Sequence, residues 1–196
     1  MKNFLNISRI ESDSVNGYQV KYSVAKREYQ PFFGFADKDA LKHCLMARNA
    51  LYREHGFPRS VLLEEIPISK HSSKSSTGWH GIYDREEVDY RRGTSVSVIS
   101  VSIRNLQTAN PTNRSFRKQH YKTEKACLNA AKRFRKNNLS SYNAIVRRYN
   151  ESIVNEAEHL IDEEVKTLKS HLHQLKGFDP ARWGRAYEQE MGREGS

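Results

Sequence analysis

The strongest constraint on the fold is a change of hydrophobic period that occurs twice along the chain. In the first instance, apolar residues alternate at Tyr18, Val20, Tyr22 and Val24 and are followed by a helical stripe that ends at Gly56. Period two is typical of a half-buried strand, whereas spacings of three and four residues are typical of a helix with one buried face. The chain therefore predicts strands followed by a helix.

The same order recurs in the second half of the chain. These expected elements are strands at residues 81–83, 94–104 and 115–121 and a helix at residues 123–136. Segments 35–40 and 121–126 align without a gap, with an aromatic residue, a capping residue and an alanine at equal spacing. We interpret this as an internal duplication. The predicted fold class is α+β, with two modules of a three-stranded antiparallel sheet plus one helix, followed by a long C-terminal helix.

Local signals position the first turn and the helix starts. Asn16-Gly17 is a strong hairpin-turn signal. Asp37 and Thr123 are residue types that accept hydrogen bonds at helix N-termini, and each precedes an apolar helical pattern.

The strands of the second module contain two expected irregularities. Val98 and Ile99 are consecutive apolar residues, which indicates a β-bulge. Arg117 and Tyr121 have the same parity, so simple alternation would bury the arginine beside the aromatic ring. We therefore expect the third strand to be interrupted between them.

These patterns divide the chain into five segments. They are a first module at 1–66, a flexible Ser/Lys-rich linker at 67–78, a second, basic module at 79–139, a long amphipathic helix at 140–177 and a loosely ordered tail at 178–196. The long helix either packs against the modules or forms a homodimer seam. The seam residues would be Ile161, Val165, Leu168, Leu172 and Leu175.

Positive charge is concentrated in the second module. The chain has 33 Lys and Arg residues against 23 Asp and Glu, a formal charge of +10. Residues 91–136 hold 12 basic side chains and a single acidic one, Glu124. A solubilising surface normally mixes both signs, whereas clustered cations repel one another unless a polyanion neutralises them. The pattern favours nucleic acid as the partner.

Several protein classes are disfavoured by composition. No segment approaches the roughly 18 consecutive apolar residues of a membrane span, and the first residues lack the apolar region of a signal peptide. We therefore expect a cytoplasmic protein of a bacterial or phage-infected cell, with no membrane partner. Cys44 and Cys127 lie in apolar helical patterns and are expected to be buried hydrophobic residues rather than disulfide or zinc ligands.

Residues 114–135 carry a family resemblance. A basic and aromatic strand is followed by Tyr121, by Thr-Glu-x-x-Ala and by an Ala-rich helix that ends in Phe134-Arg135. This segment resembles the third strand and helix of the AP2 DNA-binding domain family, and residues 33–40 are more weakly similar to it. The resemblance implies a three-stranded antiparallel sheet that lies in the DNA major groove while the helix braces it from behind.

The resemblance and the charge pattern together predict the DNA contacts. In the second module these are Arg85, Arg91, Arg92, Arg104, Arg114, Arg117 and Lys118, with Trp79 and Tyr83 as aromatic neighbours. In the first module they are Arg9, Lys21, Lys26 and Arg27. The four cations from residue 132 to 136 lie on the bracing helix and are expected to be solvent-exposed.

The sequence therefore predicts a non-catalytic, sequence-specific double-stranded DNA-binding protein, a transcriptional repressor of phage or mobile-element type. No cofactor, metal or small-molecule ligand is expected. One alternative is a DNA-processing protein derived from a homing endonuclease or recombinase. Another is a non-catalytic anti-defence or RNA-binding protein that uses the basic face. Catalysis is disfavoured because His71, His80 and His120 have no companion ligands at a recognisable spacing.

Overall fold

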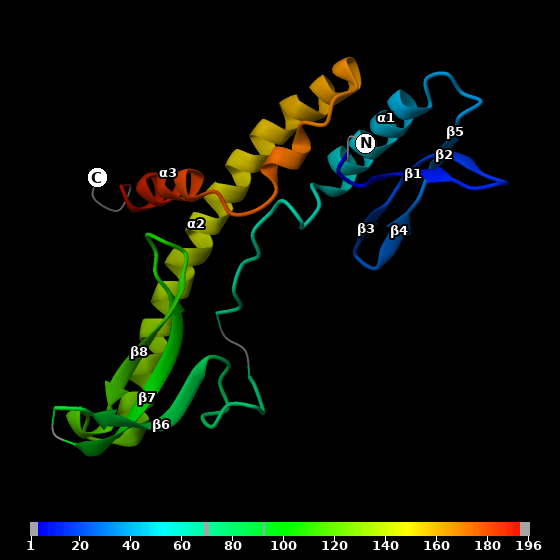
Figure 1. The fold of residues 1–196 in the computed structure, drawn as a ribbon. Coiled ribbons are helices and arrows are strands. Elements are labelled where there is room, and N and C mark those ends of the chain that lie inside the picture. Colours follow the sequence, from blue (N-terminus) through cyan, green and yellow to red (C-terminus); the bar gives the residue numbers. More distant parts are fainter. Residues whose placement is uncertain (1–3, 69–70, 92, 193–196) are drawn as a thin grey trace. The chain divides into compact units, whose positions relative to one another are not determined.

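The computed structural model describes residues 4–68, 71–91 and 93–192 and has a mixed α+β fold (Figure 1). None of the helices in these three ranges combines the length and hydropathy that crossing a bilayer requires.

Contacts divide the chain into two units. Unit 1 comprises Met1–Glu64 and Asn150–Phe178, and unit 2 comprises Glu65–Tyr149 and Asp179–Ser196. Helix α2 (Glu124–Thr167) contributes residues to both units.

Unit 1 begins with short antiparallel strands and a helix. The strands are β1 (Ile7–Glu11), β2 (Asn16–Val20), β3 (Tyr22–Val24), β4 (Arg27–Tyr29) and β5 (Phe32–Gly34), followed by α1 (Ala40–His55). The first, second and fifth strands form one sheet in the order β1-β2-β5, while β3 and β4 pair as a separate hairpin. The first module therefore has more strands than predicted.

The predicted turn at Asn16-Gly17 is wrong, because both residues lie in β2. A Cβ on Gly17 would lie 2.3 Å from the Phe33 carbonyl oxygen, so this glycine allows two strands to approach closely rather than forming a turn. The turn of the β1–β2 hairpin lies instead at residues 12–15, just before Asn16. A different hairpin, β3–β4, has the left-handed turn at Ala25 and Lys26, with φ of 48° and 67°.

Helix α1 ends as predicted and begins later than predicted. Gly56 has φ of 90°, and its N–H donates to the Tyr52 carbonyl. At the other end the N-cap position is Asp39 and not Asp37, because the Asp37 carboxylate accepts the N–H of Asp39 in a turn before the helix.

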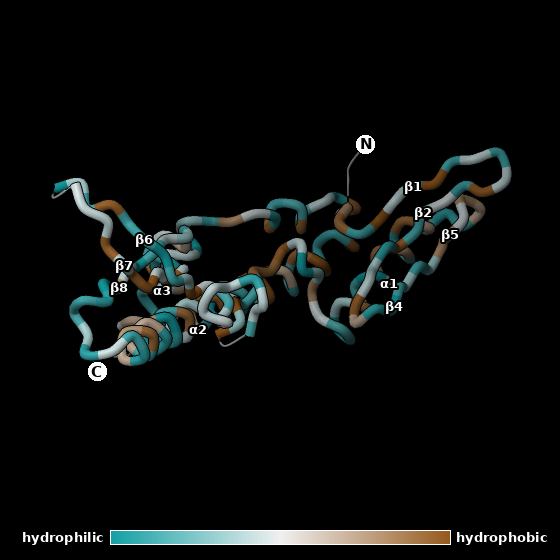
Figure 2. Tube along the Cα trace, turned by 90° about the horizontal axis from the view of Figure 1, so that it is seen from below, coloured by the Kyte–Doolittle hydropathy of each residue, from teal (hydrophilic) through white to brown (hydrophobic). Residues whose placement is uncertain are grey.

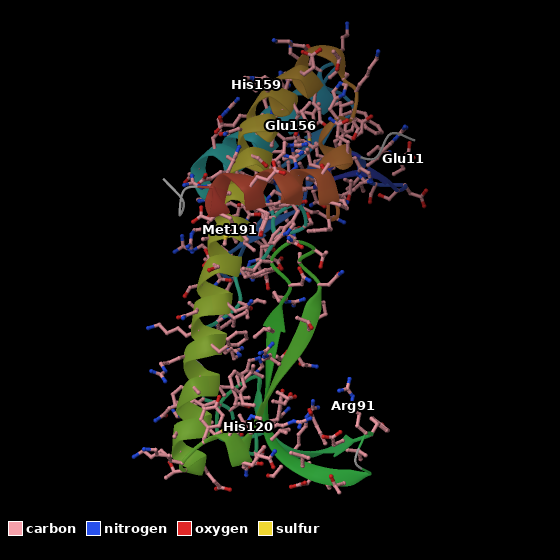
Figure 3. All side chains as sticks on the ribbon, turned by 90° about the vertical axis from the view of Figure 1, so that its left-hand side faces the viewer. Glu11, Arg91, His120, Glu156, His159 and Met191 are labelled. Carbon is pink, nitrogen blue, oxygen red and sulfur yellow. The ribbon has the colours of Figure 1, made fainter. Side chains whose placement is uncertain are left out.

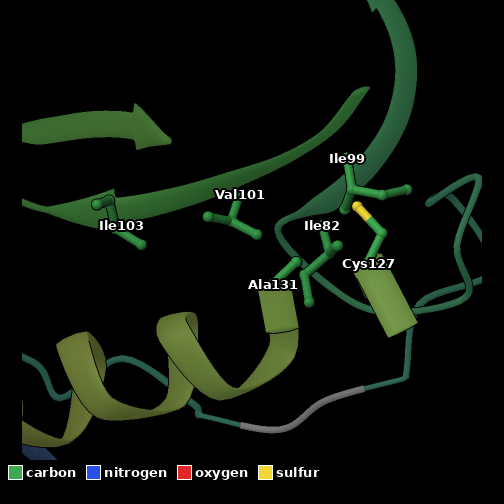
Figure 4. Packing of buried hydrophobic residues seen from close by; sticks show 6 residues of the cluster. All are labelled: Ile82, Ile99, Val101, Ile103, Cys127 and Ala131. Carbon is green, nitrogen blue, oxygen red and sulfur yellow. The ribbon is translucent and has the colours of Figure 1, made fainter. Parts of the chain in front are cut away.

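Unit 2 contains the predicted three-stranded antiparallel sheet. Its strands are β6 (Ile82–Asp89), β7 (Thr94–Arg104) and β8 (Pro111–Arg117), in the order β6-β7-β8. Ile99, Val101 and Ile103 pack with Ile82 of β6 and with Cys127 and Ala131 of α2 (Figure 4). Both cysteines are buried as expected. Thr123 caps α2 by accepting the Ala126 N–H at 3.1 Å.

The predicted bulge is absent and the predicted interruption is present. Val98 and Ile99 lie in continuous register with both neighbouring strands, and each is buried on its own face of the sheet. After β8, a 3₁₀ turn η1 (Lys118–His120) breaks the alternation. Arg117 therefore remains exposed while Tyr121 packs against the core.

The two helices predicted at 123–136 and 140–177 are a single helix that ends earlier. No glycine or proline interrupts α2, and Leu139, which is 1% exposed, continues the buried stripe from Ala131 toward Tyr142. Figure 2 shows both hydrophobic and hydrophilic residues on this helix. Leu168 ends it with φ of 51°.

The proposed seam does not form one exposed stripe, which corrects the prediction. Ile161, Leu172 and Leu175 are buried within unit 1, and the last two lie in a separate 3₁₀ helix η2 (Leu172–Leu175). Of the five seam residues, Leu168 is 43% exposed and Val165 is half-buried.

Residues 71–78 of the linker and 178–192 of the tail are more ordered than predicted. Helix α3 (Pro180–Met191) is capped by Asp179, and Trp183, which is 1% exposed, donates its indole N–H to the Leu106 carbonyl at 2.9 Å. Within residues 71–78, consecutive turns are hydrogen-bonded to one another, and Thr77 Oγ1 donates to the Ile82 carbonyl at 2.7 Å.

Candidate nucleic-acid interface

The sheet of unit 2 has one face on the helix and one face away from it. Side chains of directly opposed residues in an antiparallel pair lie on the same face. The face opposite the core is called the open face below. Away from the strand ends its residues are Tyr83, Arg85, Glu87, Val96, Val98, Ser100, Ser102, Asn113, Ser115 and Arg117, and at the strand ends Asp89, Thr94, Arg104 and Pro111 have the same parity.

Two neighbouring rows of side chains across the open face differ in residue type. In one row, Arg85 and Arg117 flank Val98, which is 1% exposed because it lies between the two long side chains. In the next row, Tyr83 and Ser115 flank Ser100. A phenol and two small hydroxyl side chains therefore adjoin a pair of guanidinium groups.

Carboxylates hold both arginines of the open face. Glu87 accepts hydrogen bonds from Arg85 Nη2 at 2.6 Å and from Ser115 Oγ at 2.7 Å. The Ser115 hydroxyl, followed by Arg85 and Arg117, lowers the pKa of Glu87. Asp89 lies 3.3 Å from Arg117 Nη2. Two cations and two anions thus balance one another on this surface.

This arrangement is suited to reading hydrogen-bonding edges rather than to attracting a polyanion. A guanidinium donates two parallel hydrogen bonds to guanine O6 and N7, and a carboxylate accepts from cytosine N4. An arginine that is already held extended by a carboxylate loses less side-chain entropy when it makes such a contact. Attraction must then come from cations elsewhere.

Two further predicted arginines of the second module contact rings of α2, although only one of them starts from the open face: Arg104 has the parity of Ser100 and Ser102, at the end of β7. The Arg104 guanidinium lies 5.7 Å from the ring centre of Tyr142 on α2. Arg114 is opposite Val101, on the helix side, with its guanidinium 5.9 Å from the ring centre of Phe134. The register therefore places Arg104 on the face of Ser100 and Ser102 and Arg114 on the opposite, helix side.

Lys118 and Trp79 are engaged within unit 2. Lys118 Nζ lies 2.8 Å from Asp84 Oδ2 and 3.0 Å from Glu124 Oε1, and both carboxylates raise its pKa. Trp79 packs against the core with Lys132 Nζ 4.1 Å from the centre of its ring. Trp79 is consequently a packing residue.

The β6–β7 hairpin turn carries Arg91. Arg91 is exposed there (Figure 3), and its N–H donates to Asp89 Oδ1 at 3.2 Å. Arg92 lies outside the described residues. Tyr90, which is 92% exposed, makes the same turn partly apolar.

Unit 1 does not gather its predicted contacts. Arg9 lies opposite Tyr18, and its guanidinium is 5.1 Å from the ring centre of Phe35. Lys21 follows β2, whereas Lys26 and Arg27 lie at the turn of the separate β3–β4 hairpin. Arg9 and Arg27 therefore belong to two separate sheets.

The two units differ in net formal charge. Unit 2 contains 20 basic and 10 acidic residues, whereas unit 1 contains 13 of each. The net charge of +10 therefore belongs to unit 2. Its exposed cations on and just before α2 that have no ion pair to any described residue are Lys122, Lys125, Arg133 and Lys136.

Sequence reasoning missed three asparagines on α2 that bind extended backbone. Asn138 bonds both the N–H and the C=O of Arg104, at 3.0 and 2.9 Å. Asn143 binds Ile66 and Asn150 binds Leu63 in the same two-bond manner. The available signal is that asparagine is a poor helix former, so its recurrence in a long helix indicates a specific partner.

No group of three or more His, Cys, Asp and Glu side chains within the described ranges could hold a metal ion. Comparisons of the chain with protein-family models, with curated proteins and with solved structures found no match.

Proposed function

We propose that the protein is a sequence-specific double-stranded DNA-binding protein that reads the major groove with the open face of unit 2 and acts as a transcriptional repressor. The observation that carries the proposal is the row in which Arg85 and Arg117 flank Val98, each arginine held by a carboxylate of β6. A two-guanidinium row on a sheet is suited to adjacent base edges.

The charge of unit 2 supports the same proposal. Duplex DNA carries dense negative charge, and a concentrated positive field raises the rate at which a protein encounters it, an effect that weakens as salt rises. A unit of net charge +10 would attract a duplex, while the balanced open face would supply base discrimination. Attraction and reading would therefore come from different residues.

The experiment begins with selection of bound duplexes from a random pool by the full chain. Gel-shift competition should then show that the selected duplex binds more tightly than random duplex or RNA of the same length. Equal competition by RNA would contradict the proposal and favour an RNA-binding protein.

A charge-conserving substitution tests the reading residues. Arg117→Lys keeps the charge and loses the two-bond guanine contact. We expect it to lower the ratio of specific to random affinity by about tenfold, because one such contact contributes roughly 1–3 kcal/mol of discrimination. The matched control is Arg133→Lys on α2, which should leave the ratio unchanged. Equal effects of the two variants would exclude the open face as the reading surface.

A further inference from the structure

Arg135 of α2 is an unusual cation because it is buried without a counter-ion. It is 4% exposed, and Nη1 donates to the Ile68 carbonyl at 2.7 Å, but Nε has no hydrogen-bond partner. Among the described residues, no carboxylate forms an ion pair with it. Gly81 lies directly against the guanidinium, since a Cβ there would be 2.9 Å from both Nε and Nη2.

Such a side chain destabilises the folded state unless a bound ligand supplies the missing charge and hydrogen bonds. A buried charge that lacks both an ion pair and full hydrogen bonding destabilises the folded state, and an apolar residue at this position in the stripe would avoid that penalty. The neighbours one helical turn away, Ala131 and Leu139, are both apolar and buried. Burial also lowers the pKa of Arg135.

A cavity of about 180 Å³ adjoins this guanidinium within unit 2. Its polar lining consists of His80, Tyr83, Ser102, Arg104 and Arg135, and none of its lining residues is acidic. The volume is sufficient for a polyatomic ion, because one water molecule needs only roughly 10–15 Å³ of such space. Two guanidinium groups, two hydroxyls and an imidazole are a donor set for a tetrahedral oxyanion.

We propose that this cavity binds a phosphate group, with Arg135 as the charged residue at its floor and Arg104 as the second cation. The site differs from the reading surface in chemistry, because its cations face no carboxylate. It does not depend on DNA binding. Tyr83 and Ser102 belong both to the cavity lining and to the open face, so the phosphate could come from a soluble molecule or from the backbone of a bound duplex.

The test is a ³¹P NMR titration of inorganic phosphate with the full chain in chloride buffer of constant ionic strength. We expect saturable binding with a dissociation constant of about 1 mM or tighter. Arg135→Met should abolish it, and the matched control Lys125→Met, on the exposed surface of the same helix, should leave it unchanged. Absence of saturable binding to the wild type, or equal binding by folded Arg135→Met, would overturn the proposal.

A second variant covers the case in which Arg135→Met does not fold. Arg104→Met removes the other guanidinium and should weaken phosphate binding at least tenfold. Unchanged binding by this variant would also overturn the site.

Competition with a short duplex then identifies the source of the phosphate. Release of inorganic phosphate on addition of duplex would assign the cavity to a backbone phosphate, and retention would assign it to a soluble phosphate ligand. Because the first titration contains no DNA, failure of the phosphate site is distinguishable from failure of DNA binding.

Discussion

Arg48 and Glu164 form the most completely buried ion pair described in unit 1. Both side chains are fully buried, and Arg48 Nη2 lies 2.8 Å from Glu164 Oε2. Glu164 Oε1 also accepts the backbone N–H of His171 and of Leu172, which places η2 against α2. Removing one member of a buried pair leaves an uncompensated charge, which is more harmful than removing both.

We expect Arg48→Met to lower the free energy of unfolding by about 3–5 kcal/mol. The added substitution Glu164→Gln should recover part of this loss, because a neutral amide oxygen still accepts both backbone N–H groups. Urea unfolding of the two single variants and the double variant gives the coupling energy. Additive losses in the double variant would show that the pair is not coupled.

Glu87 holds two donors of the open face in place while reducing its positive charge. Glu87→Gln keeps an acceptor for the Ser115 hydroxyl but removes the ion pair with Arg85. We expect the affinity for random duplex to rise a few fold, because the face gains one net positive charge. Discrimination between selected and random duplex should fall, because Arg85 is no longer held. Competition gel shifts at constant salt measure both, and an unchanged discrimination ratio would show that the carboxylate does not position Arg85.

At the scale of elements, asparagine side chains of α2 bond backbone groups that have no neighbouring strand to pair with. Its asparagine side chains present an N–H and a C=O side by side, as a peptide group does, and so complete extended segments beside the helix. Asn143 is 4% exposed and Ile66 is half-buried, so loss of the amide leaves the partly buried N–H and C=O of Ile66 without their described partner.

We expect Asn143→Ala to lower the free energy of unfolding by about 1–3 kcal/mol, the usual penalty for an unsatisfied buried polar group. The exposed Asn137 of the same helix provides the control, since Asn137→Ala removes no described bond and improves helix propensity. Hydrogen exchange at the Ile66 amide should accelerate in the Asn143 variant alone. Equal stability of both variants would show that the two bonds contribute nothing.

Elements with strong local signals were predicted well, and those defined by long-range contacts were not. The strand containing Ile99, Val101 and Ile103 shows clear alternation, and its residues occupy the core as predicted. The helix across Leu139 was split in two because the surrounding asparagines and serines are weak helix formers, whereas burial of Leu139 decided the outcome. The capping signal of Asp179 before Pro180 was present and was missed.

The candidate site was predicted less completely than the fold, for a physical reason. Charge counts identify the basic segment, but the direction of each arginine depends on strand register and on neighbouring rings. Arg117 lies on the open face because it pairs with Val98, whereas Arg114 pairs with Val101 and lies near Phe134 on the helix side. Arg135, which was expected to be exposed, is 4% exposed, because it lies between Ala131 and Leu139 in the buried stripe of α2 and packs against Gly81.

The predicted dimer seam depends on how much of its apolar surface remains exposed. Three of the five seam residues, Ile161, Leu172 and Leu175, are buried within unit 1. The accessible part of the seam is therefore Leu168 and the half-buried Val165. We expect Leu168→Asp to leave the molar mass in light scattering unchanged at micromolar concentration. A dimer mass for the wild type and a monomer mass for Leu168→Asp would show that the seam does form a homodimer.

At the scale of the whole molecule, the proposed function makes the association rate depend on the +10 charge of unit 2. The preference for one DNA sequence should depend on the charge-balanced open face. Lys125 and Lys136 are exposed on α2, behind the sheet, and therefore act on a duplex at the open face only through space. The Debye length is about 30 Å at 0.01 M salt and about 8 Å at 0.15 M salt, so their influence should vanish at physiological ionic strength.

The double substitution Lys125→Gln, Lys136→Gln should therefore slow association several fold at 0.01 M salt and have little effect at 0.15 M salt. Its dissociation rate and its preference for the selected duplex should match the wild type at both concentrations. Stopped-flow fluorescence with a labelled duplex separates these quantities. If dissociation accelerates or the preference changes, the lysines contact the duplex directly, and the interface must then include α2 rather than the open face alone.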